Sequence, residues 1–153
     1  MDNFTDVKDL SFKSYSNFCA MAQNEGIVLG EGIRELIKDI KFDGKTLNSE
    51  QHALGDVSEL GLSEETCITE LRKAMRAFAL KKLTPVQALR AFVQNISDIK
   101  NTKIRFIAHM NPLKDKDGSV FLGAEWIDGK LHLKAYQIDR KKILREVVFV
   151  AIR

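Results

Sequence analysis

The residues of this chain that are suited to chemistry lie on two neighbouring strands of a hairpin. Residues 119–127 and 130–138 both alternate apolar with polar side chains, as half-buried strands do. An Asp-Gly pair at 128–129 joins them, and this dipeptide is the strongest short signal for a two-residue hairpin turn. Such a turn fixes the register of the two strands. It places Glu125 directly opposite His132, on the face that we expect to point away from the helices.

The same sheet face gathers further polar side chains, some from the alternating segment 103–110. They are Arg105, His109, Lys134 and Tyr136. A carboxylate opposite an imidazole, flanked by cations, has the groups that metal-independent RNA cleavage needs: a base, an acid and positive charges for the phosphate. The catalytic residues under this hypothesis are Glu125, His132, His109, Arg105 and Lys134. The alternative is a cross-strand pair on a face that solvent or a partner covers.

The distribution of charge along the chain favours a binding function. The net charge is +3, but residues 1–65 hold 6 Lys and Arg against 13 Asp and Glu, whereas residues 66–153 hold 18 against 8. The two parts therefore carry −7 and +10. A local positive field attracts phosphates and carboxylates. We expect a small binding or regulatory protein, antitoxin-like or immunity-like, that engages nucleic acid or an acidic protein through its basic strand-rich half.

Two alternatives to this binding function remain open. One is the toxin-like endoribonuclease described above, and the other is a structural subunit of a larger assembly. The expected binding surface combines aromatic anchors with cations of the sheet and its loops, as protein interfaces do. These residues are Phe121, Tyr136, Lys134, Arg105, Lys114, Lys116, Lys141 and Lys142.

Apolar residues at three- and four-residue spacing predict about four helices in the first hundred residues. The predicted helices span about 12–24, capped by Ser11 and ended by Gly26, then 32–41, then about 64–82 after a cap at Ser63, and 85–96. The third helix has a buried stripe of Ile68, Leu71, Met75 and Phe78. The fourth begins with a capping box of Thr84 and Gln87. Residues 43–62 predict a long connection with a short helical turn near 49–54.

After Asn101 the apolar period changes from about 3.6 to 2. Strands are predicted at 103–110, 119–127, 130–138 and 145–152, and the last is apolar at nearly every position, which indicates an interior strand. The predicted fold is α+β, with about four N-terminal helices followed by a roughly four-stranded antiparallel sheet. We expect residues 1–153 to form a single domain, mainly helical to about residue 100 and strand-rich beyond it.

The sequence contains no complete motif for another type of functional site. Gly44-Lys45-Thr46 resembles the end of a phosphate-binding loop, but Asp39 stands where the first glycine belongs. Cys19 and Cys67 lack a metal-binding spacing and are expected to be structural thiols. We therefore expect no cofactor and no metal. The absence of a long apolar run or a signal-like start predicts a cytoplasmic protein without membrane contact.

Overall fold

The computed structural model describes residues 3–6, 14–42, 51–94, 105–116, 118–138 and 143–152. Its helices are α1 (Tyr15–Asn24), α2 (Glu31–Lys38), α3 (Ile68–Ala77) and α4 (Pro85–Gln94), with a 3-10 helix η1 (Val57–Leu60). Its strands are β1 (Asn3–Asp6), β2 (Gln51–Asp56), β3 (Arg105–Ala108), β4 (Leu113–Asp115), β5 (Gly118–Ile127), β6 (Lys130–Gln137) and β7 (Val147–Ile152). The α+β class with helices mostly before the main strands is confirmed.

The strands form one sheet in the order β1-β2-β7-β3-β5-β4. β3 and β4 pair with different parts of one edge of β5, and β6 pairs with the opposite edge. The pairs are antiparallel except for β3 and β7, which run parallel. The sheet is therefore larger than the four strands expected, because β1, β2 and β4 add to it. The expectation that the last strand is interior is confirmed, since β7 lies between β2 and β3.

The predicted helical turn near residues 49–54 is wrong for residues 51–54, which lie in β2, while residues 49 and 50 lie outside the described part of the chain. The strand has the sequence QHALGD, in which Gly and Asp are poor strand formers and no residue is β-branched. It is a strand because β1 and β7 flank it on both edges. Both partners are distant in the chain, so local sequence carries little of the signal.

The hairpin of β5 and β6 has the predicted register throughout, from Phe121 opposite Tyr136 to Ile127 opposite Lys130. Asp128 has φ 51° and Gly129 has φ 77°. Two consecutive positive φ values define the type I′ turn, whose twist matches that of the strands it joins. The turn therefore places Glu125 opposite His132, as expected.

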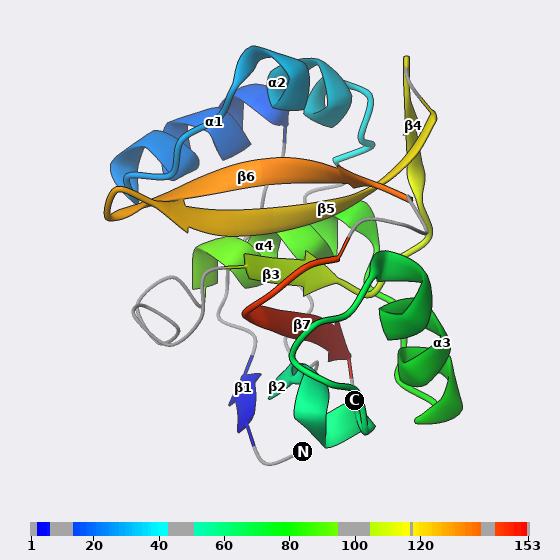
Figure 1. Ribbon diagram of the computed structural model, residues 1–153. Coiled ribbons are helices and arrows are strands. Elements are labelled where there is room, and N and C mark those ends of the chain that lie inside the picture. Colours follow the sequence, from blue (N-terminus) through cyan, green and yellow to red (C-terminus); the bar gives the residue numbers. More distant parts are fainter. Residues whose placement is uncertain are drawn as a thin grey trace.

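Helices lie against both faces of the sheet and along one edge (Figure 1). α4 packs on β5, and α3 reaches the same strand through Arg72, whose guanidinium lies 5.4 Å from the centre of the Phe121 ring. Val28 closes the outer edge of β6, because its N–H donates to the Leu131 carbonyl and its carbonyl accepts from Leu133. The prediction that the Glu125 face points away from the helices is therefore wrong for the part that α3 covers.

Three helix ends show how local chemistry sets the element bounds. Ser14 caps α1 by accepting a hydrogen bond from the Asn17 N–H at 3.1 Å, and Gly26 with φ 74° ends the helix as predicted. The expected cap Ser11 lies outside the described residues. In α4 the capping box is confirmed: the Thr84 N–H donates to Gln87 Oε1, and the Gln87 N–H donates to Thr84 Oγ1.

The third helix starts later than predicted, at Ile68 with Cys67 as its N-cap. Thr66 cannot begin a helix because its N–H and carbonyl form a bridge with Leu144, just before β7. A pairing partner almost eighty residues away thus overrides the start signal at Ser63. Ile68, Leu71 and Met75 form the buried stripe of α3, as expected.

Candidate functional site

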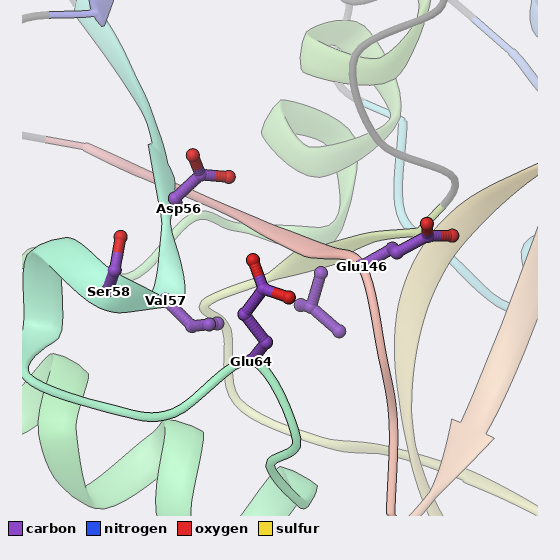
Figure 2. A pocket seen from close by; sticks show the side chains of 6 residues that line it. Asp56, Val57, Ser58, Glu64 and Glu146 are labelled. Carbon is purple, nitrogen blue, oxygen red and sulfur yellow. The ribbon is translucent and has the colours of Figure 1, made fainter.

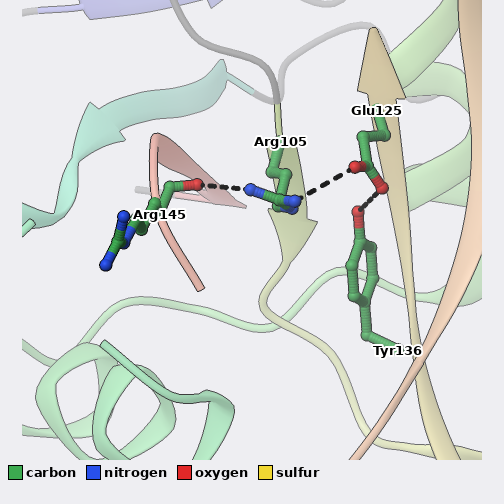
Figure 3. Close-up of polar contacts among 4 residues, drawn as sticks. All are labelled: Arg105, Glu125, Tyr136 and Arg145. Atoms are coloured by element: carbon green, nitrogen blue, oxygen red, sulfur yellow. Dashed lines mark hydrogen bonds and ion pairs between the residues drawn. The ribbon is translucent and has the colours of Figure 1, made fainter. Parts of the chain in front are cut away.

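The predicted catalytic face holds a closed cluster of three side chains, Arg105, Glu125 and Tyr136 (Figure 3). Arg105 Nη2 lies 3.3 Å from Glu125 Oε1, and the Tyr136 hydroxyl donates to Glu125 Oε2 at 3.0 Å. Arg105 Nη1 also donates to the carbonyl of Arg145 at 2.9 Å. Both carboxylate oxygens of Glu125 are thus engaged by the protein itself. The cluster links β3, β5 and β6 to the segment that leads into β7.

Glycine at position 123 gives the Tyr136 ring its place in this cluster. A Cβ on Gly123 would collide with the ring and would lie 2.6 Å from the carbonyl oxygen of Phe106. Burial and the adjacent Glu125 carboxylate raise the pKa of Tyr136 far above its usual range, so the phenol stays protonated and remains a donor. Phe121 and Tyr136, expected as anchors for a partner, are only 3% and 7% exposed.

His109 lies apart from this cluster, although alternation places it on the same face. Its side chain is 2% exposed, and Nε2 contacts the Leu80 carbonyl at 3.2 Å. Because a carbonyl only accepts, Nε2 carries the hydrogen of the bond. The pKa of His109 is lowered to about 4, chiefly by burial and also by the positive charges of Lys82, Arg76 and Arg72, while the hydrogen bond to the Leu80 carbonyl opposes the shift. His109 is therefore a neutral packing residue that fastens the end of α3.

The structure thus does not assemble the expected acid–base set. His132 is half-buried opposite Glu125, as predicted, but Glu125 binds Arg105 and Tyr136 instead of activating an imidazole. Lys134 is half-buried opposite Gly123. A general base must be free to take a proton from its substrate. This arrangement serves cohesion of the sheet better than proton transfer.

The predicted binding lysines divide between described and undescribed parts of the chain. Lys114 on β4 and Lys116 in the following turn are both exposed. Figure 1 places β4 at the margin of the molecule. Lys141 and Lys142 lie outside the described residues. The expected cationic loops therefore supply two lysines that a partner can reach.

A denser group of cations lies where sequence reasoning did not place a site, at the carboxyl end of α3 and in the loop after it. Residues 72–82, RKAMRAFALKK, contain five cations and no acid. We call this surface the cationic end of α3, and it consists of Arg72, Lys73, Arg76, Phe78, Lys81 and Lys82. All but the half-buried Arg72 are exposed. Within the part of the chain that the structure describes, none of the five cations forms an ion pair.

Phe78 is the aromatic member of this surface, and its predicted burial is wrong. It follows the buried stripe of α3 in sequence, yet its side chain is 52% exposed. The chain reverses at Ala79, which has φ 55°, and this sends Leu80 back toward the protein and leaves Phe78 outside. The sequence did contain a signal in the run of cations around one aromatic residue. The helical period masked it, because that period assigned Phe78 to the core.

The 78–83 loop is fastened at both ends. The Ala79 and Leu80 N–H groups donate to the carbonyls of Arg76 and Met75, which closes the end of α3. His109 binds the Leu80 carbonyl through its ring, and its own carbonyl accepts from the Leu83 N–H at 2.8 Å. These hydrogen bonds therefore fix the backbone of the loop from which Lys81 and Lys82 extend.

Two hollows elsewhere on the molecule have less chemical content. A pocket of about 30 Å³, the space of a single water, is lined by the carboxylates of Asp56, Glu64 and Glu146 (Figure 2). An open groove of about 600 Å³ beside α1 is lined by Arg34 and Lys130 among others. The Arg34 Nε already donates to the protein's own Leu29 carbonyl, 3.2 Å away. Neither hollow presents a set of free groups comparable to the cationic end of α3.

Comparisons with family models, with curated proteins and with solved structures give no match to this chain. Among the described residues, no cluster of three or more His, Cys, Asp or Glu is arranged to hold a metal ion. None of the described helices has the length and apolar character that crossing a membrane would require. The function must therefore be inferred from the surface itself.

Proposed function

We propose that this protein is a binding module that engages an acidic partner through the cationic end of α3. The observation that carries the proposal is the set of five cations in residues 72–82, with no acid among them and no ion pair within the described chain. Exposed like charges repel one another and destabilise the fold slightly. An acidic partner would convert that repulsion into attraction.

Other charged parts of the molecule support this choice by contrast. Arg105 is paired with Glu125, and Arg145 with Glu65 at 2.9 Å. Those cations are neutralised by the protein's own carboxylates. At the cationic end of α3, Lys82 has a neutral partner, the Asn111 side chain at 2.9 Å, which orients the ammonium without cancelling its charge. The charge of Lys82 is thus held in place, and the charges of this surface are left for an external anion.

The test is charge reversal at two exposed lysines of this surface, Lys73→Glu and Lys81→Glu together. We expect the double variant to bind a fluorescent single-stranded oligonucleotide of about 12 nucleotides at least roughly tenfold more weakly, measured by anisotropy at low salt. The slope of log affinity against log salt should fall by about 1.4, or about 0.7 for each lost phosphate contact. A glutamate-rich peptide of equal charge provides a second acidic probe.

The matched control is Lys114→Glu with Lys116→Glu, which changes the net charge equally at two other exposed lysines. We expect this variant to keep most of the affinity, because it leaves all five cations of the cationic end of α3 in place. Equal losses in the two double variants would contradict a defined site on α3. Absence of binding to both acidic probes by the unmodified protein would overturn the proposal altogether.

A further inference from the structure

We infer that the acidic partner is a single-stranded nucleic acid, and that Phe78 is the platform on which one of its bases stacks. This inference rests on the proposed function and names the class of ligand. Phe78 and Ile143 are the exposed large apolar side chains among the described residues, with exposed fractions of 52% and 61%. Within four positions on either side, Phe78 has basic residues and no acidic residue, whereas Ile143 has acidic residues in that range.

The exposure of the Phe78 ring is built into the backbone and does not reflect a frayed helix end. The Phe78 N–H donates to the Ala74 carbonyl at 3.1 Å, and the two following N–H groups also bind carbonyls of α3. The left-handed conformation at Ala79 costs roughly 1–2 kcal/mol in a residue with a Cβ. The native structure accepts this cost at Ala79, and the resulting turn keeps the Phe78 ring outside the core. The binding penalty is also lower, because the loop is already ordered before the ligand arrives.

The order of the cations along the chain, before and after Phe78, fits a ligand with charges on both sides of a flat group. Lys73 and Arg76 precede the ring in sequence, and Lys81 and Lys82 follow it. A single strand presents this pattern, since phosphates flank each base and the base has a free π-face. A duplex hides its bases in the stack and would use only the cations. An acidic peptide has carboxylates but no flat group for the ring.

The experiment compares three oligomers of about 12 units and equal charge: oligo(dT), oligo(U) and an abasic strand that keeps only sugar and phosphate. Binding is measured by anisotropy for the unmodified protein and for Phe78→Ala and Phe78→Trp. We expect Phe78→Ala to weaken binding to oligo(dT) and oligo(U) by roughly 5- to 150-fold and to leave the abasic strand unaffected. Phe78→Trp should restore the loss. The two base-bearing strands also report the combined effect of the 2′-hydroxyl group and of the 5-methyl group of the base.

Ile143→Ala is the matched control. It removes an exposed apolar side chain that has no ring on which a base could stack, so it should leave all three affinities unchanged. Circular dichroism verifies the fold of each variant. Equal affinity of the unmodified protein for base-bearing and abasic strands would overturn the inference while leaving the proposed function intact. Tight binding of the glutamate-rich peptide alone would do the same. Failure to bind any of these polyanions would overturn the proposed function, and the inference with it.

Discussion

The Arg105–Glu125–Tyr136 cluster and the cationic end of α3 both combine charged side chains with an aromatic ring, but they differ in whether the charges are paired and the ring is buried. In the cluster, each charge meets its opposite and the aromatic ring is 7% exposed. At the cationic end of α3, five cations meet no carboxylate within the described chain and the ring is 52% exposed. The first arrangement satisfies its own groups, and the second leaves them for another molecule.

This contrast teaches that residue type alone does not locate a functional surface. A carboxylate opposite an imidazole was the most suggestive pair in the sequence, yet Glu125 is occupied by two stabilising contacts. Buried polar groups that are fully paired make a structure rigid. Exposed charges of one sign have no such role within the fold. Variants that break the paired region should therefore cost stability, whereas variants at the unpaired region should change binding.

The largest expected effect is that of Gly123→Ala. The new Cβ would collide with the Tyr136 ring and would lie 2.6 Å from the Phe106 carbonyl oxygen, which belongs to the sheet backbone and cannot move aside. We expect the free energy of unfolding to fall by at least about 3 kcal/mol in urea titrations. Gly32→Ala is the control, since its Cβ would meet nothing within 4 Å in a helical position. The free energy of unfolding of that variant should rise by about 0.5–1 kcal/mol. A mild effect at Gly123 would show that the cluster is loosely packed.

A second effect tests the residue that fastens the cationic end of α3. The pKa of His109 is lowered to about 4 in the folded protein from 6.5. The unfolded chain therefore binds the proton first, and the stability contribution is complete above pH 6.5 and lost as the pH falls toward 4. Between about pH 7 and about pH 5 the loss should be roughly 2 kcal/mol. His109→Gln should lack this part of the pH dependence of unfolding. Identical pH profiles for the two proteins would contradict a buried, neutral His109.

The smallest expected effect concerns Ala79. Its φ of 55° lies in the left-handed region, where glycine carries no Cβ penalty. Ala79→Gly should raise the free energy of unfolding by about 0.5–1 kcal/mol. The same exchange two residues earlier, Ala77→Gly, falls within α3 and should lower it by a similar amount. Thermal unfolding of both variants gives the comparison, and a loss of stability at position 79 would argue against the left-handed turn that exposes Phe78.

The features that sequence predicted well are those governed by local chemistry. The Asp-Gly turn set the register of β5 and β6, and the pairing of Thr84 with Gln87 marked the start of α4. The helix predicted at 32–41 is also present, and its apolar residues at three- and four-residue spacing are buried: Ile33, Leu36 and Ile37 within α2, and Ile40 just beyond it. Each of these depends on residues within a few positions of one another, so the pattern contains the cause.

The features that sequence missed depend on contacts between distant residues. β2 is a strand because of β1 and β7, and α3 begins late because Thr66 pairs with Leu144. The occupation of Glu125 by Arg105 follows from the pairing of β3 with β5. The exposure of Phe78 required knowledge of the turn at Ala79, where alanine gives no hint of a positive φ. Tertiary pairing thus decided the occupation of Glu125, whereas a local turn that alanine does not signal decided the exposure of Phe78.

The place of β7 in the sheet has a consequence during protein synthesis. β7 joins β2 on one edge and β3 on the other, and it comes later in the chain than both. A ribosome therefore delivers two sheet fragments, one with β1 and β2 and one with β3, β4, β5 and β6, before the strand that unites them. Until then each fragment has an unpaired strand edge, which is a template for association with other chains. Chaperone demand should therefore be greatest in the interval before β7 emerges.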